Sequence, residues 1–126
     1  MGTKRPRPLV LDAGALIAAD RADRRVIALL ELAQEIHVPA GALAQVWRNP
    51  ARQVRLARIV SSDGVVVHSL DAVSARAAGQ LCAATATSDV VDASVVLVAR
   101  VVGGVTVTSD PDDLRRLDRG IDLVRC

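Results

Sequence analysis

Apolar residues occur along the chain in two alternating patterns: short continuous runs, and longer stretches in which they recur at helical spacing. The short runs predict buried strands at residues 8–11, 37–38, 65–67, 105–108 and 121–124. The longer stretches predict helices at residues 13–19, 24–36, 40–48, 51–61, 71–84, 89–102 and 112–118. Because strands alternate with helices, we expect a three-layer α/β/α fold with helices on both faces of a mostly parallel central sheet.

Length and composition favour a single domain. The chain has 126 residues, 51% of them hydrophobic, with one Trp and neither Phe nor Tyr. A core of adequate size can therefore form, but it must be built from Ala, Val, Leu and Ile. Residues 1–7 are basic and rich in proline, so we expect a flexible basic tail at 1–7 and one domain at 8–126.

Several classes of protein are disfavoured by the same sequence. The apolar run after the basic tail is interrupted at Asp12, which argues against a signal peptide. Asp92 and Arg100 interrupt the apolar stretch at 90–107, which argues against a membrane span. Two isolated cysteines form neither a disulfide framework nor a zinc motif, so a reducing cytoplasm is expected.

Carboxylates follow two of the predicted strands and begin one of the predicted helices. Asp12 directly follows the first strand, and Asp110 follows the strand at 105–108. Asp89 and Asp92 are three residues apart, so they share a face in the first turn of a helix. In an open α/β sheet, functional groups gather outside the carboxyl ends of the strands. Crowded carboxylates are suited to Mg²⁺ or Mn²⁺, and a metal held in this way can promote phosphodiester hydrolysis.

Three of these carboxylates also have a purely structural interpretation. Asp12 and Asp89 could each cap the helix that follows, and Asp110 precedes Pro111 as turn and cap residues often do. Asp92 is harder to explain in this way, because it lies inside an apolar helix where an unpaired carboxylate is costly. Both interpretations stay open at this point.

The sequence resembles the PIN-domain family, and within it the VapC-type toxins of bacterial toxin–antitoxin pairs. The matching stretches are residues 9–18, 38–48, 89–93 and 107–114, and the resemblance covers about residues 8–125. It implies a Mg²⁺- or Mn²⁺-dependent endoribonuclease, inhibited by a cognate antitoxin protein and able to form a homodimer. It places the catalytic, metal-binding acids on Asp12, Asp92 and Asp110, with Asp89 as an additional carboxylate beside them.

One position departs from the family pattern. The second acidic position, usually Glu, falls on Gln45, whose neutral amide contributes no charge. Asp89 could restore that charge; otherwise the chain would be a catalytically weakened PIN-like module that binds RNA or protein. Gln45, Ser109 and Thr108 are candidates for polar support of the site.

An arginine series offers a candidate RNA-binding surface. All but one of the 16 basic residues are arginines, and Arg48, Arg52, Arg55 and Arg58 follow helical spacing. Such a stripe could contact phosphates, although a solvated helix face is the simpler explanation. The net charge of +2 does not by itself indicate a nucleic-acid-binding protein.

A phosphoacceptor receiver domain would also place aspartates at strand ends. That class needs a lysine after the last of these strands, and the only lysine here is Lys4. We therefore rank it below both the ribonuclease and the non-catalytic module.

Overall fold

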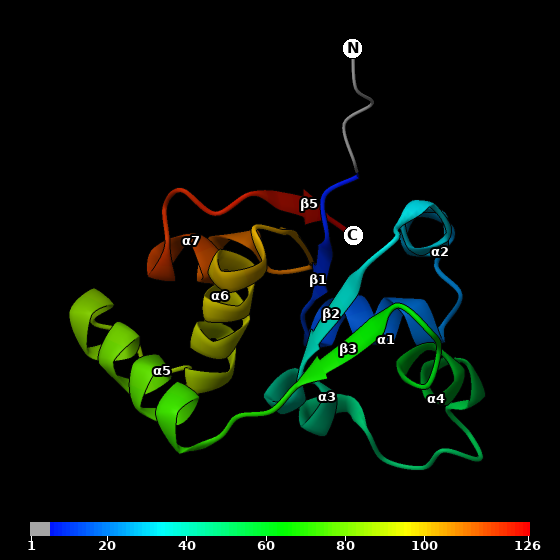
Figure 1. Cartoon of the computed structure of the whole chain (residues 1–126), viewed down its shortest axis with the longest axis horizontal. Helices are drawn as coiled ribbons and strands as arrows, with labels where there is room; N and C mark the ends of the chain where they lie inside the picture. Colours follow the sequence, from blue (N-terminus) through cyan, green and yellow to red (C-terminus); the bar gives the residue numbers. More distant parts are fainter. Residues whose placement is uncertain (1–5) are drawn as a thin grey trace.

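A sheet of five parallel strands forms the centre of the molecule (Figure 1). The structure, a computed structural model, describes residues 6–126. The strands are β1 (Leu9–Leu11), β2 (Ile36–Pro39), β3 (Val65–His68), β4 (Val105–Thr108) and β5 (Leu123–Arg125). Their order is β3-β2-β1-β4-β5, and each neighbouring pair is parallel. The predicted α/β fold is confirmed, and all five strands described are parallel.

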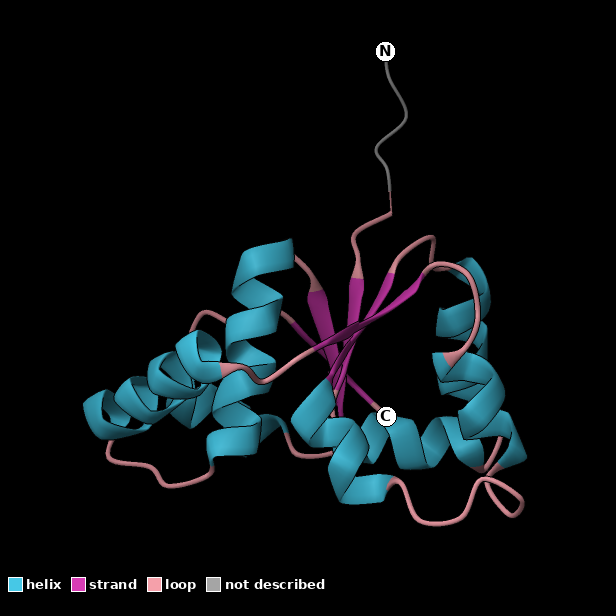
Figure 2. Ribbon diagram, turned by 60° about the horizontal axis from the view of Figure 1, so that its bottom comes forward, coloured by secondary structure: helices cyan, strands magenta, loops and turns pink. Residues whose placement is uncertain are grey.

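Seven helices surround this sheet in the described part of the chain. Figure 2 shows the three C-terminal helices on one side of the strands and the second and fourth helices on the other. They are α1 (Ala13–Asp20), α2 (Arg24–Leu32), α3 (Ala40–Val46), α4 (Val54–Val60), α5 (Ala72–Thr85), α6 (Val90–Val102) and α7 (Pro111–Leu117). The largest fully buried side chains are Leu, Val and Thr, so the expected aliphatic core is present.

The second helix is shorter than its apolar pattern predicts. The prediction of a helix over 24–36 is wrong beyond Leu32, where α2 ends. Ile36 instead begins β2, pairing with Leu9 on one side and Val65 on the other. An apolar residue can satisfy both helical spacing and a buried strand, and pairing with two neighbouring strands favours the strand here.

The helices predicted at 40–48 and 51–61 are separated by a longer break. α3 ends at Val46 and α4 begins at Val54. The side chain of Gln53 holds this break together: its Oε1 accepts hydrogen bonds from the backbone N–H groups of Arg48 (2.8 Å) and Asn49 (3.0 Å). Its Nε2 donates to the Val46 carbonyl at 2.7 Å. These bonds satisfy backbone groups that an uninterrupted helix would otherwise pair.

The predicted basic tail falls mainly outside the described residues, which begin at Pro6. Arg7 lies within them and forms an ion pair with Asp122 at 2.8 Å. Its guanidinium also donates to the carbonyls of Gly103 and Gly104. Residue 7 is thus anchored to the segment before β4, and the tail at 1–7 stays a prediction.

Two histidines far apart in sequence meet on neighbouring strands. His37 of β2 lies opposite Val66 of β3, two residues before His68, and Nδ1 of His37 is 2.7 Å from Nε2 of His68. On the other side of its ring, His37 contacts Glu35 at 3.2 Å. A hydrogen bond between two imidazole nitrogens requires one of them to be unprotonated. Burial and the neighbouring His37 lower the pKa of His68 below 6.5.

This pair predicts a loss of stability in mild acid. Below pH 6.5 the unfolded chain takes up a proton on His68 that the folded chain resists, so unfolding becomes easier as the pH falls toward the folded pKa. We expect the stability of wild type relative to His68→Gln to decrease between pH 7.5 and 5.5. Urea unfolding of both proteins across this range measures it. A difference that does not change with pH would contradict the prediction.

No single helix in residues 6–126 is long and apolar enough to cross a membrane. Helices α5 and α6 would reach that length and composition only as a pair, and they are bent by 106° at the break between them.

Candidate carboxylate site

The strand order places two aspartates at the point where the chain changes direction across the sheet. From β1 the chain builds outward through β2 and β3, and then returns to the other side of β1 as β4. Asp12 follows β1, and Asp110 comes two residues after β4. A crevice forms at such a switch point, because the connections after the two strands lead in opposite directions. The topology therefore brings both side chains to the same edge of the sheet. Asp110 lines one surface hollow there and Asp92 another, and we call this edge the carboxylate crevice.

Asp12 is buried and held by two neighbours. Only 5% of it is exposed, and its Oδ1 accepts a hydrogen bond from the Ala15 backbone N–H at 2.9 Å, capping α1. Burial raises the pKa of Asp12; the hydrogen bond with the Thr108 side chain opposes this, and the charge of Asp110 adds to it. Asp12 is thus both a helix cap and a carboxylate that another acid repels.

Thr108 connects the two aspartates at the switch point. It is fully buried at the end of β4, where it hydrogen-bonds the Asp12 side chain. Its Oγ1 also accepts from the backbone N–H of Asp110 at 2.9 Å. One hydroxyl therefore orients a carboxylate and the backbone of the other acid. The sequence suggested Thr108 only as possible polar support, because its burial could not be known in advance.

Helix α6 contributes Asp92 from its first turn. Asp89 caps this helix, accepting from the Asp92 backbone N–H at 2.9 Å. Burial raises the pKa of Asp92 to about 7, and the charges of Asp89, Asp12, Asp113 and Asp110 add to the effect. Like charges gathered at a site disfavour ionisation in this way. The raised pKa therefore reflects five carboxylates close enough to influence one another.

Asp113 is a member of this group that sequence analysis missed. It lies in the first turn of α7, and it lines a hollow of about 260 Å³ together with Asp89 and Asp92. Its position in an acidic turn near Asp110 could have suggested it. Only the packing of α7 beside α6, however, shows that it faces Asp92.

The donor set fits a hard divalent cation by its chemistry. Carboxylate oxygens are the ligands that Mg²⁺ and Mn²⁺ prefer, and a cation would relieve the repulsion that adds to the effect of burial on the pKa of Asp92. Within residues 6–126, however, no three acidic, histidine or cysteine side chains are arranged so as to hold one ion together. Binding would require these side chains to move closer.

Gln45 lies on α3 and is exposed. Gly41, one turn earlier on the same face of α3, faces α6: a Cβ there would lie 3.5 Å from Val91 and 3.8 Å from the Ser94 hydroxyl. Gln45 therefore extends from a helix packed against the start of α6, near the turn that carries Asp92. It provides an amide where a further carboxylate was expected.

Ser109, the third candidate for polar support, lies against Gly14, next to the Asp12 carboxylate: a Cβ on Gly14 would be 3.5 Å from Asp12 Oδ1. A Cβ on Gly14 would overlap the Ser109 hydroxyl and lie 3.1 Å from Ser109 Cβ. Ser109 is exposed at the surface beside Asp110. The absence of a side chain at Gly14 thus lets the loop after β4 approach the start of α1.

The predicted arginine stripe is not a continuous helical surface. Arg48 and Arg52 lie in the break between α3 and α4, and only Arg55 and Arg58 are helical. The Arg48 guanidinium donates to the carbonyls of Ala44 (3.2 Å) and Trp47 (2.7 Å), at the end of α3. The expected spacing fails because the chain turns at Asn49 and Pro50.

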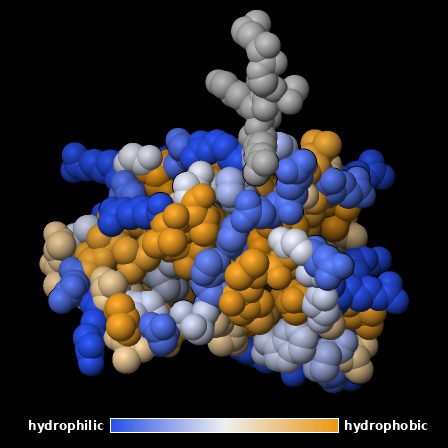
Figure 3. Space-filling view, in the orientation of Figure 1, coloured by the Kyte–Doolittle hydropathy of each residue, from blue (hydrophilic) through white to orange (hydrophobic). Residues whose placement is uncertain are grey.

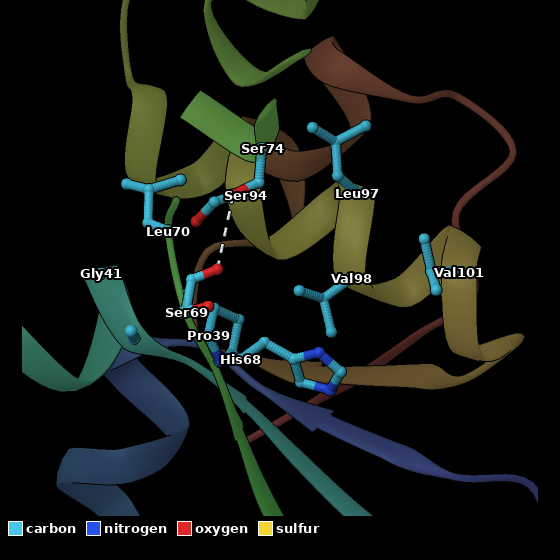
Figure 4. Close-up of a pocket in the computed structure, with 11 residues that line it drawn as sticks. Pro39, Gly41, His68, Ser69, Leu70, Ser74, Ser94, Leu97, Val98 and Val101 are labelled. Carbon is cyan, nitrogen blue, oxygen red and sulfur yellow. Dashed lines mark hydrogen bonds between the residues drawn. The ribbon is translucent and has the colours of Figure 1, made fainter. Parts of the chain in front are cut away.

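A separate apolar hollow of about 150 Å³ lies at the carboxyl ends of β2 and β3 (Figure 4). His68 lies at one side of it, with Val98 and Val101 of α6 beside it. Apolar side chains also cover the surface over β3 and the end of α6 (Figure 3). None of the described residues that line this hollow is a carboxylate, so it is distinct from the carboxylate crevice.

Comparisons with solved structures show the same fold in bacterial toxin–antitoxin proteins. A chain of VapBC2 from Rickettsia felis, crystallised with a promoter DNA fragment, has a TM-score of 0.71 and 15% identity, covering 94% of this chain and 98% of that chain. VapC20 of Mycobacterium tuberculosis, a toxin that cleaves the sarcin–ricin loop, has a TM-score of 0.66 and 19% sequence identity. The match covers 94% of this chain and 99% of that chain. FitAcB from Neisseria gonorrhoeae has a TM-score of 0.59 and 14% sequence identity, and the match covers 91% of this chain and 95% of that chain.

A comparison with curated proteins found no match. The sequence pattern of the PIN domain, however, matches residues 9–120, from the first residue of β1 to the turn after α7. This range contains the strand ends, the start of α6 and all five carboxylates described above. The resemblance inferred from the sequence is confirmed, and the chain belongs to the PIN-domain family.

Proposed function

We propose that this protein is a metal-dependent endoribonuclease, the toxin of a type II toxin–antitoxin pair. The observation that carries the proposal is the group of carboxylates at the ends of β1 and β4 and the start of α6, where burial and the charges of neighbouring acids raise the pKa of Asp92 to about 7. Membership of the PIN family supports the choice of nuclease chemistry. The solved toxin structures of the same fold support the choice of a toxin.

Asp12, Asp92 and Asp110 would hold the cation, with Asp89 close enough to add negative charge. When bound, Mg²⁺ or Mn²⁺ would neutralise the crowded carboxylates and stabilise charge on the phosphate being cleaved. Thr108 keeps Asp12 and the Asp110 backbone in position.

Metal-dependent cleavage by the purified chain tests the proposal. We expect a labelled single-stranded RNA to be cut in Mn²⁺ or Mg²⁺, to stay intact in EDTA, and to be cut again when metal is restored in excess. Intact RNA at saturating metal and protein would refute the ribonuclease.

A pH dependence of metal binding follows from Asp92. Its carboxyl binds a proton more tightly in the folded chain than in the unfolded one, so the metal-free protein loses stability as the pH rises from 3.8 to about 7. A cation must displace that proton below pH 7. We expect the apparent Mn²⁺ affinity to fall about tenfold per pH unit below 7 and to level off above it. Calorimetric titrations at pH 5.5, 6.5 and 8.0 measure this.

Asp92→Asn provides the comparison, because it removes the titrating group while keeping the shape of the side chain. Its weaker binding should vary less with pH than that of wild type. Equal wild-type affinity at pH 5.5 and 8.0 would contradict the assignment of Asp92 as a ligand.

Gln45 favours a second candidate function, a PIN domain that binds RNA or protein without efficient cleavage. In this case binding would need no metal and would survive the loss of Asp12. The neutral amide on α3 and the absence of a ready three-ligand group in residues 6–126 both point in this direction.

Gln45→Glu decides how much this position matters. A carboxylate on α3 would add charge near Asp92, so we expect the Mn²⁺ affinity to rise about tenfold. Cleavage at low metal concentration should rise with it. Gln80→Glu, at an exposed position on α5, is the matched control and should change neither quantity. No effect of Gln45→Glu would place residue 45 outside the site.

The expected partners follow from the same proposal. They are the RNA substrate, a cognate antitoxin protein and a second copy of this chain in a homodimer, within the cytoplasm and without a membrane. The structures of VapBC2 and FitAcB support the antitoxin as a partner. Copurification with the product of a neighbouring short gene is the direct check.

A further inference from the structure

Helix α7 combines acidic and basic residues next to the carboxylate crevice. It begins directly after Asp110, with Asp112 and Asp113 in its first turn and Arg115 and Arg116 in its last. Two more arginines follow nearby in the chain. Arg119 lies in the turn after α7, and Arg125 ends β5.

Three hollows meet along this helix. The first, about 260 Å³, is lined by Asp89, Asp92, Asp113 and Arg116. The second, about 350 Å³, is lined by Asp110 and Asp113 together with Arg115, Arg116 and Arg125. The third, about 620 Å³, is lined by Arg115, Arg116 and Arg119 together with Thr85 and Thr87. Because Arg116 lines all three, a continuous surface leads from the carboxylates to the arginines.

The guanidinium groups on this surface are available to a ligand. Arg115 and Arg116 pair only within their own helix, with Asp112 at 3.5 Å and Asp113 at 3.4 Å, and their side chains are 55% and 72% exposed. Exposed pairs of this kind contribute little to stability, so a phosphate can compete for them. Within residues 6–126, neither Arg119 nor Arg125 forms an ion pair.

The arginines expected from the sequence are less well placed. The Arg48 guanidinium is engaged with two carbonyls at the end of α3. Arg52 and Arg55 are exposed, but they line neither hollow that contains the site carboxylates. A strand with one phosphate at the carboxylates would therefore meet arginines on the α7 side.

We propose that single-stranded RNA leaves the crevice across α7, with its phosphates held by Arg116, Arg119 and Arg125. This rests on the proposed ribonuclease and names the surface that holds its substrate. Arginine suits the task because its planar fork can donate two hydrogen bonds to one phosphate. An acidic polypeptide is the competing ligand for such a surface. Arginines and carboxylates line the same hollow, and this favours RNA over an acidic polypeptide. A cation bound by the carboxylates would attract the phosphates of RNA to this hollow.

The test measures binding of a fluorescent single-stranded RNA in Mg²⁺, with Asp12→Asn as the background so that RNA is not consumed. In that background, Arg119→Gln plus Arg125→Gln should weaken binding about tenfold at 0.1 M salt. The slope of log affinity against log salt should fall by about 1.4, because two phosphate contacts to a single strand are lost. Arg76→Gln, exposed on α5, is the control and should leave both quantities unchanged.

The α4 side provides the comparison that can overturn the proposal. If Arg52→Gln plus Arg55→Gln reduces the salt slope of RNA binding and Arg119→Gln plus Arg125→Gln does not, RNA passes along α4 and the proposed path across α7 is wrong. If the Arg119 and Arg125 pair weakens binding of polyglutamate but not of RNA, the surface serves an acidic protein and the RNA path is wrong. Melting temperatures of all variants verify folding.

The two proposals can fail separately. Wild type that binds RNA through Arg119 and Arg125 but never cleaves it would refute the ribonuclease and support this path. Cleavage by wild type, together with an unchanged salt slope for the variant Arg119→Gln plus Arg125→Gln, would support the ribonuclease and refute this path.

Discussion

Asp12→Asn is expected to reduce RNA cleavage by about a thousandfold or more, because it removes the most buried charge from the metal-binding set. The fold should survive. Asparagine can still accept the hydrogen bond from the Ala15 backbone that caps α1. Burial and the charge of Asp110 raise the pKa of Asp12, so asparagine at this position removes an unfavourable buried charge and its repulsion with Asp110 and Asp92. The metal-free variant should therefore melt at the same temperature as wild type or higher.

Two measurements distinguish this result from simple unfolding. Saturating Mn²⁺ should raise the melting temperature of wild type but much less that of Asp12→Asn, since a ligand that binds only the folded state stabilises it. Asp71→Asn is the matched control, because Asp71 caps α5 with the same geometry, accepting from Ser74 at 2.9 Å, outside the crevice. Full activity in Asp12→Asn, or equal loss in Asp71→Asn, would contradict the assigned role.

Gly104→Ala is expected to destabilise the protein by about 2 kcal/mol, because the new methyl group has no room. A Cβ at residue 104 would lie 2.8 Å from the Pro8 carbonyl oxygen, 3.1 Å from Val10 and 3.2 Å from Val102. The Pro8 carbonyl is backbone and accepts the Val105 N–H at 2.9 Å, where β1 and β4 begin to pair. Relief of the overlap would shift the strand that leads to Asp12.

Gly79→Ala is the opposite case and the control for this substitution. Residue 79 lies within α5, and a Cβ there meets nothing within 4 Å. Alanine favours the helix over glycine, so we expect a gain of about 0.5–1 kcal/mol. Urea unfolding of both variants at pH 7.5 measures the change in the free energy of unfolding, which should be a loss for Gly104→Ala and a gain for Gly79→Ala. A neutral Gly104→Ala would show that β1 and β4 can separate without cost.

The elements nearest the carboxylates were predictable because their signals are local. Asp89 and Gly103 mark the two ends of α6 as capping residues do, and both roles are observed. The apolar run before Asp12 predicted β1 to within one residue. The errors fall where local patterns compete with pairing across the sheet, as at Ile36, or where a side chain reorganises a turn, as Gln53 does.

By itself the sequence determined the fold class and pointed to Asp12, Asp92 and Asp110, because local apolar patterns indicate where strands end and helices begin. The family followed from the resemblance of four stretches to the PIN domain. Tertiary structure alone decided which side chains meet. It placed Asp113 beside Asp92, Thr108 between Asp12 and Asp110, and His37 against His68. These contacts depend on strand order, which no local spacing encodes, since the chain returns to pair β4 with β1 only after passing through β2 and β3.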